Sequence, residues 1–144
     1  MITIQDFTNP VITCPADATV ECNTPNDPTV TGTATATDNC DDDIEITWSD
    51  DVNVVDDCTT IITRTWTATD NCDNASTCTQ VITIEDFTNP VITCPSDATV
   101  ECNTPNDPTV TGTATATDNC DDDIEITWSD DVNVVDDCTT IITR

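Results

Sequence analysis

The stretch TTIITRTWTATD, residues 59–70, decides the fold. From residue 62 onwards, threonine alternates with a second set of side chains, and this set consists of Ile62, Arg64, Trp66 and Ala68. A period of two places the two sets on opposite faces of a strand, one toward a core and one toward solvent. The segment therefore predicts a half-buried antiparallel strand.

Similar alternation occurs throughout the chain. TVTGTATATD (29–38) repeats the threonine pattern, and the other candidate strands are PVITC (10–14), ATVEC (18–22), DIEITWS (43–49), VNVV (52–55) and STCTQVITIED (76–86). Asn, Asp and Pro provide turns between them, as in DNCDDD (38–43), SDD (49–51) and DNCDN (70–74). No segment of about ten residues or more has helical periodicity. Seven short strands in one repeat predict an all-β, immunoglobulin-like β-sandwich.

The chain is a tandem repeat with a period of 80. Residues 1–64 and 81–144 are identical at 61 of 64 positions, and the three differing pairs are Met1/Val81, Gln5/Glu85 and Ala16/Ser96. Near-identical neighbours offer each other the same interfaces. We expect residues 1–6 to be the tail of a preceding repeat, 7–86 a complete repeat, and 87–144 a second repeat that lacks its last strands.

The incomplete second repeat has two explanations, and both remain open. Either the 144 residues are a window on a longer polypeptide, which we favour, or a neighbouring chain supplies the missing strand. An unpaired sheet edge invites such pairing. We therefore expect other copies of the same chain as partners, joined end to end or by strand completion in a filament.

Composition excludes several functions. The chain has 29 acidic side chains, two basic ones and no histidine, so its net charge is −27. Such a charge repels nucleic acid and anionic lipid, and no apolar run approaches the roughly 18 residues that a membrane span needs. Without histidine or lysine, the commonest general bases are missing. The sequence predicts a protein that is not an enzyme, does not bind nucleic acid and does not insert into a membrane.

Cysteine content indicates an oxidising compartment. Ten cysteines in 144 residues are typical of small extracellular domains that are stabilised by disulfides. A structural zinc site is less compatible with the sequence because no CxxC pair occurs. We expect an extracellular or cell-surface location.

Three segments of the repeat resemble a known family. DFTNPVITCP at the start, TWTATDNCDNASTC near the end and the closing TQVITIED are similar to hyalin-repeat (HYR) domains, especially the tandem HYR-like repeats of bacterial surface proteins, including those of the Bacteroidota. The resemblance covers the whole repeat, and it implies an extracellular sandwich that serves in adhesion or as a stalk. Two features depart from the family pattern: Asp73 stands where the DxxGN turn usually has glycine, and each repeat has six cysteines.

Six cysteines allow many connectivities, and the sequence alone does not choose among them. In the expected topology Cys14 and Cys78 lie on neighbouring strands, and the resemblance suggests the same pair. Both Cys40 and Cys72 follow a TATDN segment, so we expect them to meet at one end of the sandwich. This leaves the pair Cys22 and Cys58 near the other end.

Acidic and amide side chains cluster in the loops and connecting segments. The expected topology brings one set to a single end of the sandwich, and this set is Asp6, Asn9, Asp38, Asn39, Asp41, Asp70, Asn71 and Asp73. The second copy comprises Asp86, Asn89, Asp118, Asn119 and Asp121. Roughly six to eight oxygen ligands suit Ca²⁺. We predict a Ca²⁺ site at each repeat junction, against the alternative of a solvated acidic surface that binds no ion.

Taken together, the sequence predicts a structural repeat of an extracellular stalk or filament, stiffened by disulfides and Ca²⁺. The alternative function is an adhesin module that binds a glycan or a host or cell-surface protein through its loops. Glycan-binding modules usually expose aromatic side chains, whereas we expect Trp48, Trp66 and Trp128 to be core or linker residues. We expect Arg64 to be a structural ion-pair or stacking residue.

Overall fold

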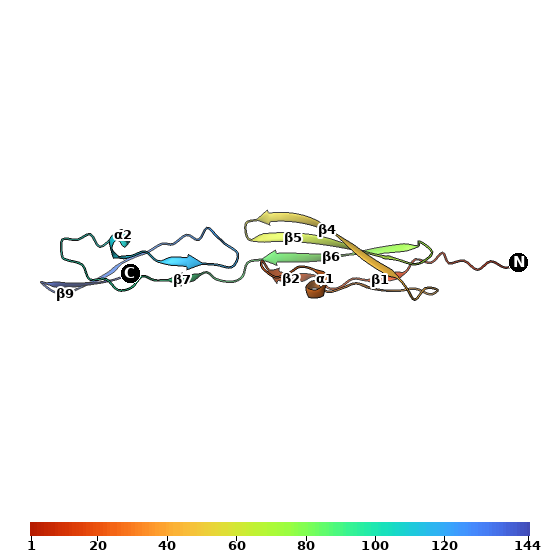
Figure 1. The fold of residues 1–144 in the computed structure, drawn as a ribbon, viewed down its shortest axis with the longest axis horizontal. Coiled ribbons are helices and arrows are strands. Elements are labelled where there is room, and N and C mark those ends of the chain that lie inside the picture. The colour runs from red at the N-terminus through yellow and green to blue at the C-terminus, as the bar shows by residue number, and fades with distance from the viewer. The chain divides into compact units, whose positions relative to one another are not determined.

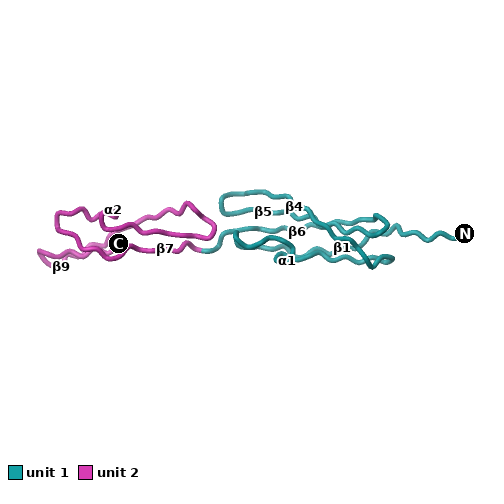
Figure 2. Tube along the Cα trace, in the orientation of Figure 1, with its two compact units in different colours: residues 1–88 teal, residues 89–144 magenta.

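A computed structural model describes residues 1–144 as two compact units, Met1–Thr88 and Asn89–Arg144 (Figure 2). The division falls close to the boundary predicted at residues 86 and 87. Strands make up 42% of the chain and helices only 6%, which confirms the all-β class. Each unit is described separately below.

Unit 1 (Met1–Thr88) is organised around a four-stranded sheet. Its strand order is β2-β6-β5-β4, and the strands are β2 (Ala18–Glu21), β6 (Ala75–Glu85), β5 (Thr59–Thr69) and β4 (Glu45–Asp56) (Figure 1). A second, two-stranded sheet pairs β1 (Val11–Thr13) with β3 (Thr35–Thr37). The strand predicted over 59–70 is therefore central, because it pairs along its whole length with β4 and β6.

Three predictions about turns and strands in unit 1 are wrong. The predicted turn at SDD (49–51) lies inside β4, where long antiparallel pairing with β5 keeps the backbone extended. The predicted strand over 29–38 shortens to β3, because Pro28–Thr31 forms a short helix, α1. Asp27 caps this helix by accepting a hydrogen bond from the Thr29 amide, and Pro28 starts it. In addition, β2 runs parallel to β6, whereas adjacent strands were expected to be antiparallel.

The apolar core of unit 1 is small. Val20, Ile62 and Ile82 form its buried cluster, and Ile84 packs against them. Trp66 and Ala68 are also buried on the same face of β5, as their alternation predicted. Trp48 was expected in the core or a linker, but it is 51% exposed, because it lies on the edge strand β4.

Unit 2 (Asn89–Arg144) has less regular structure. It contains β7 (Val91–Thr93) paired with β8 (Thr115–Thr117), β9 (Asp131–Asp136) paired with β10 (Thr139–Thr143), and the short helix α2 (Pro108–Thr111). Residues 98–101 have the sequence ATVE of β2 but form no strand. Residues 87–144 hold no counterpart of β6, and β6 is the strand with which β2 pairs in unit 1.

Candidate functional site

Part of the predicted acidic site comes together in unit 1. Asp6, Asp38 and Cys40 each place one oxygen or sulfur atom within 4.8 Å of the other two. Asp6 precedes β1, and the other two residues follow β3, the strand with which β1 pairs. Pairing of these two strands therefore positions the group.

One oxygen of each carboxylate in this group has no hydrogen-bond donor. Oδ1 of Asp6 accepts the Thr8 amide at 3.0 Å, and Oδ1 of Asp38 accepts the Cys40 amide at 2.8 Å. Oδ2 of both residues is buried and unpartnered. Burying an anionic oxygen without a partner is unfavourable, and a bound cation would offset that cost.

Cys40 was predicted as a disulfide partner, not as a neighbour of the acidic site. Partial desolvation by its neighbours, together with the charges of Asp6 and Asp38, raises the pKa of its exposed thiol. The Asn39 amide donates to its Sγ at 2.9 Å. Two of the three side chains in the group are carboxylates, and carboxylate oxygens suit a hard cation. The DNC tripeptide, which places a thiol two residues after the turn carboxylate, was the available sequence signal.

Asp41 joins the two loops that were predicted to share one end of the unit. Its Oδ2 accepts the Asn71 amide at 2.7 Å, and its Oδ1 accepts Asn71 Nδ2 at 3.1 Å and the Asp43 amide at 2.9 Å. The amides of Asp43 and Asn71 lower the pKa of the Asp41 carboxyl group. Asp41 and Asn71 thus bind each other across the loops and have a structural role in this geometry.

Asp70 and Asp73 shape the turn between β5 and β6. Asp70 is buried, and it accepts the amides of Cys72 and Asn74, both at 2.8 Å, and Asn74 Nδ2 at 2.7 Å. Burial alone would raise the pKa of Asp70, but these donors outweigh it and lower the pKa. Asp73 has a φ of 66°, the left-handed conformation that normally favours glycine. Asp adopts it more readily than most residues do, which explains why the DxxGN turn forms without glycine.

The remaining predicted ligands are placed as follows. Asn9 and Asn89 are exposed. In unit 1, Asp86 accepts the Thr88 amide at 3.1 Å, as Asp6 accepts Thr8. In unit 2, Asp118 accepts the Cys120 amide at 2.8 Å, and its Oδ2 is buried and unpartnered like that of Asp38. Asn119 Nδ2 donates to Cys120 Sγ, and Asp121 accepts the Asp123 amide, so unit 2 repeats the loop geometry of unit 1.

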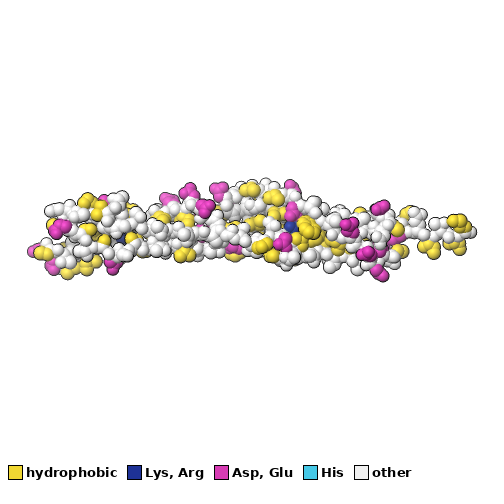
Figure 3. Space-filling model, in the orientation of Figure 1, with side chains coloured by type: hydrophobic (Ala, Val, Ile, Leu, Met, Phe, Trp, Pro, Cys, Tyr) yellow, Lys and Arg dark blue, Asp and Glu magenta, His cyan; other side chains and the backbone are white.

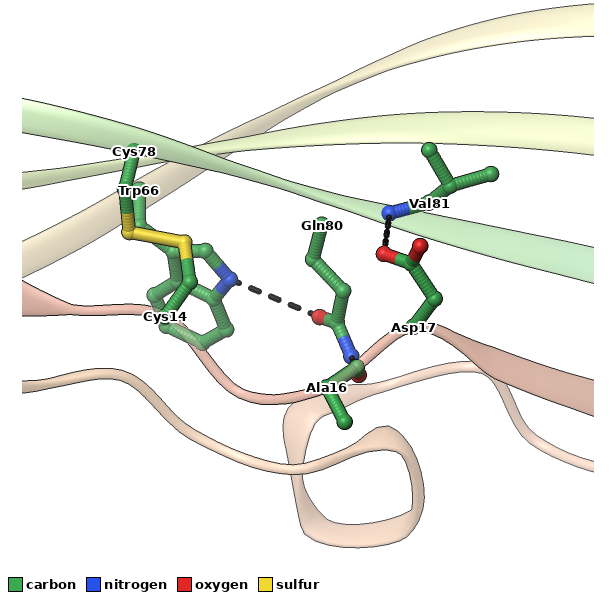
Figure 4. Close-up of a disulfide and its surroundings, with 7 residues drawn as sticks. All are labelled: Cys14, Ala16, Asp17, Trp66, Cys78, Gln80 and Val81. Atoms are coloured by element: carbon green, nitrogen blue, oxygen red, sulfur yellow. Dashed lines mark hydrogen bonds between the residues drawn. A yellow bond between two sulfur atoms is a disulfide. The ribbon is translucent and has the colours of Figure 1, made fainter.

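The predicted Cys14–Cys78 disulfide is present. It links the segment after β1 to β6, with a Cα–Cα distance of 5.9 Å (Figure 4). The Trp66 indole lies beside it and donates to Gln80 Oε1 at 3.4 Å. Gln80 Nε2 in turn donates to the carbonyl oxygens of Ala16 and Thr31 at 2.8 and 2.7 Å. Gln80 was missed by the sequence reasoning, although it is the one amide in the buried alternation of β6.

Two predicted disulfides are not formed. Cys40 and Cys72 are exposed thiols. Their loops are held together by Asp41 and Asn71 instead. Cys22 takes part in a disulfide, but Cys58 is not its partner. Two disulfides nevertheless indicate that the chain belongs in an oxidising environment rather than the cytoplasm.

Arg64 is fully enclosed in unit 1, with 1% of its surface exposed. It forms a bidentate pair with Asp50, at 2.7 Å from Nε and 2.8 Å from Nη2, and donates to Thr31 Oγ1 and the Asn26 carbonyl oxygen. Its guanidinium lies 5.9 Å from the ring centroids of both Trp48 and Trp66. The expected structural role is therefore confirmed. Arg144 makes the same contacts in unit 2, with Asp130, Thr111 and Asn106.

Acidic side chains are distributed along the visible face of both units, with little basic surface between them (Figure 3). No helix of the structure has the length and apolar character that crossing a membrane would require. Comparison with protein-family models and with curated proteins found no match to the chain.

Proposed function

We propose that the chain is a non-enzymatic structural repeat of an extracellular stalk or filament. The repeat is an HYR-like, immunoglobulin-type β-sandwich in this proposal. The two sheets of unit 1 and the Cys14–Cys78 link between them support that identity. The presence of two disulfides supports the extracellular location.

The observation that carries this proposal is the path of the chain through unit 1. Near the N-terminus, the Pro10 carbonyl oxygen accepts a hydrogen bond from Ser76, next to the first residue of β6, at 2.6 Å. The chain leaves after Glu85, the last residue of the same strand. An 11-residue strand is about 35 Å long. A unit whose chain enters and leaves at opposite ends of its longest strands extends an array with every repeat.

The C-terminal end of unit 1 is also fixed to its connecting segment. The Glu21 carboxylate accepts the Phe87 amide at 3.4 Å and Thr88 Oγ1 at 3.0 Å. The Asp86 amide donates to the Cys58 carbonyl oxygen at 3.2 Å. These contacts hold the first residues after β6 against the unit, which favours a stiff connection over a flexible linker.

Ca²⁺ is the proposed stiffening ion. The buried and unpartnered oxygens of Asp6 and Asp38 support a cation at that position, and hard oxygen donors favour Ca²⁺ over zinc. In this proposal Asn9 and Asn39, which are close in sequence to Asp6 and Asp38, complete the shell. In unit 2, Oδ2 of Asp118 is likewise buried and unpartnered, which supports a cation beside that carboxylate.

Calorimetric titration of the chelated protein with Ca²⁺ tests the ion site. We expect binding heat in the micromolar to millimolar range and a raised melting temperature. Asp38→Asn should weaken binding by at least about tenfold, whereas Asp42→Asn, at an exposed neighbouring position, should not. Absence of heat up to several millimolar Ca²⁺ would remove the ion from the proposal.

Electron microscopy of the native material tests the structural role itself. We expect beaded rods with a repeat of about 35–45 Å, from the strand length plus a short connection. Isolated globular particles would contradict the role. Rods without Ca²⁺ binding would retain the structural proposal and exclude only the ion.

One observation favours the second candidate, an adhesin module. Trp48 and Trp128 are both more than half exposed, and an exposed indole is a stacking surface for sugar rings. Tryptophan fluorescence titrated with glycans tests this function. A saturable change that Trp48→Ala or Trp128→Ala abolishes would support binding, and no response across a broad glycan panel would contradict it.

A further inference from the structure

We propose that the free edge of β4 pairs with the same edge of β4 in a second copy of the chain. The two strands run antiparallel and are related by a two-fold axis at Val52. This inference goes beyond the proposed structural role, because it joins copies side by side and does not depend on how repeats follow one another along a chain. Three features of β4 carry it: an unpaired edge, exposed apolar side chains, and a register in which no two carboxylates face each other.

β4 is the longest strand of unit 1, and it forms one border of the four-stranded sheet (Figure 1). It pairs with β5 from Glu45 to Asp56 and with no other strand. The backbone groups on its other side therefore have no partner in the sheet. A long edge strand with unpaired amide and carbonyl groups is a template on which another strand can pair.

Exposed apolar side chains line β4 on the face that it shares with the buried side of β5. Trp48, Val52 and Val54 are 51%, 57% and 70% exposed. In the register with β5, Trp48 and Val52 lie beside Trp66 and Ile62, whose side chains are buried. The apolar interior thus continues to the border of the sheet, where more than half of each side chain stays in water. A second β4 beside it would remove part of that area from water.

The middle of β4 carries little uncompensated charge, although the whole chain is strongly acidic. Asp50 accepts two hydrogen bonds from Arg64, at 2.7 and 2.8 Å, so its charge is neutralised. Glu45 and Asp56 lie at the two ends of the strand. This leaves Asp51 as the one carboxylate in the middle of β4 without a cationic partner. Two copies of this edge can therefore approach each other with little repulsion.

Charge also selects the register of the pair. When two antiparallel strands are related by a two-fold axis, residues that face each other point to the same side of the sheet. An axis at Val52 sets Asp51 of each copy opposite Asn53 of the other, so each carboxylate meets an amide donor. No carboxylate of β4 then lies opposite another, whereas an axis at Asp51 or Asn53 would set two of them face to face. An axis at Ser49 also separates the carboxylates, but it leaves Val54 beyond the end of the second strand.

The axis at Val52 brings the exposed apolar side chains together. Val52 of one copy faces Val52 of the other. Val54 faces Asp50, whose charge is already compensated, and lies diagonal to Trp48, within reach of an aromatic side chain. The pair spans residues 48–56 of each copy, which is about 30 Å of strand. Main-chain hydrogen bonds and side-chain contacts therefore coincide, as they do where a strand is added to an exposed sheet edge.

Unit 2 has the same edge. β9 has the sequence of residues 51–56, and it pairs on one side only, with β10. Its Val132 and Val134 are both more than half exposed. Asp131 and Asn133 provide the same carboxylate and amide. Each edge forms a self-complementary, isologous contact, so a copy with two such edges can associate beyond a dimer.

Light scattering coupled to size exclusion, over a concentration series of the full chain, is the first test. EDTA, alkylation of exposed thiols and about 500 mM salt remove cation bridging, disulfide exchange and long-range repulsion. We expect mass to increase with concentration beyond that of a dimer. Val52→Asp/Val132→Asp should keep the chain monomeric, because two carboxylates then meet on the axis of each edge. Val132→Asp alone should stop association at the dimer.

A matched control separates the edge from the total charge. Thr77→Asp/Thr79→Asp adds the same two charges at exposed positions of β6, which is not an edge strand. We expect this variant to associate like the wild type. Thermal melting followed by tryptophan fluorescence shows that each variant remains folded.

An exchange of side chains tests the register. Asn53→Asp/Asn133→Asp sets carboxylate against carboxylate in both reciprocal pairs of an interface, so association should weaken about five- to thirtyfold. Adding Asp51→Asn/Asp131→Asn again places an amide opposite each carboxylate, with the net charge of the wild type, and should restore association. With an axis at Ser49, the second exchange would restore nothing.

Hydrogen exchange gives the location of the contact. Amides of residues 48–56 and 131–136 should gain protection as the concentration rises, and those of β2, the other edge strand of the sheet, should not. Mass that does not depend on concentration would leave the edge to a strand of another protein and overturn the inference. Association that persists in Val52→Asp/Val132→Asp, or that the side-chain exchange fails to restore, would also overturn it.

Failure of this inference is distinguishable from failure of the structural role. Native rods that always lie singly would reject the β4 interface and leave the structural role intact. Globular native particles that pair through β4 would retain the interface and reject the structural role.

Discussion

Arg64 shows, at the scale of single residues, how a chain with few apolar side chains builds a specific interior. Its guanidinium donates four hydrogen bonds, to Asp50, Thr31 and Asn26, and lies near two indole rings. The hydrogen bond with Asp50 outweighs burial and raises the pKa of Arg64, so the pair stays charged. Because the guanidinium is planar and rigid, these hydrogen bonds fix Asp50, Thr31 and Asn26 in one arrangement around it.

Removing Arg64 alone should be costly. Arg64→Met leaves Asp50 and Thr31 without their buried partner, and we expect the free energy of unfolding of unit 1 to fall by about 3–5 kcal/mol. Urea denaturation followed by tryptophan fluorescence measures it. Asp50→Leu in the same chain should recover part of the loss, and Asp57→Asn, at an exposed site, should have little effect. Equal stability of wild type and Arg64→Met would contradict a structural role.

Gly32 is the second residue on which the local structure depends. Its φ is 98°, and a Cβ atom there would lie 2.9 Å from Cβ of Pro15. Gly32→Ala should therefore destabilise unit 1 by about 1–3 kcal/mol. The neighbouring exposed substitution Thr33→Ala is the matched control in the same denaturation assay. A neutral Gly32→Ala would show that the turn relaxes without cost.

At the scale of elements, β5 and β6 determine whether a unit closes. β6 separates β2 from β5, contributes Ile82 to the core, and carries both Gln80 and Cys78. Unit 2 has no counterpart of β6 in residues 87–144, and its ATVE segment is not a strand. The ATVE segment is therefore a strand where β6 lies beside it and is not a strand where β6 is missing.

The Cys14–Cys78 bond should supply much of the stability of unit 1. It closes a loop with a sequence separation of 64, which corresponds to roughly 4 kcal/mol in the chain-entropy model. We expect Cys14→Ala/Cys78→Ala to lower the melting temperature by more than about 10 °C. Cys94→Ala removes the exposed counterpart of Cys14 in unit 2 and serves as control. Melting that is unchanged in the double variant would reject this role.

The turn between β5 and β6 should make unit 1 sensitive to acid. The folded-state pKa of Asp70 lies below its unfolded value, so the unfolded chain binds the proton first as pH falls. The contribution of Asp70 is present above pH about 4 and declines as pH falls below it toward the folded pKa. We expect denaturation between pH 6 and 2 to show this decline, and Asp70→Asn to flatten it. An identical pH profile in the variant would contradict the assignment.

At the scale of the whole molecule, charge is the dominant property. A net charge of −27 on 144 residues opposes compaction through self-repulsion. Covalent and hydrogen-bonded links in unit 1 hold the chain against this repulsion. The same charge disfavours nonspecific contact between copies, so any assembly needs a specific and largely uncharged interface.

Salt should therefore stabilise the fold. Raising the salt concentration from about 20 to 500 mM shortens the screening length several-fold, and we expect the melting temperature to rise by a few degrees. Sodium, potassium and tetramethylammonium chloride should act alike if screening is the cause. A falling melting temperature, or an effect of one cation alone, would contradict this explanation.

The sequence by itself determined the all-β class, the period of 80 and the buried face of β5. These follow from alternation and self-similarity, which are local or repeated patterns, whereas the Cys14–Cys78 pair was predicted from the expected strand topology together with the family resemblance. Only the tertiary structure decided that β2 runs parallel to β6, that 49–51 stays extended, that Trp48 is exposed, and that Asp41 binds Asn71 while Cys40 joins Asp6 and Asp38. Those features depend on which strand lies beside which, and pairing between distant segments leaves no trace in local periodicity.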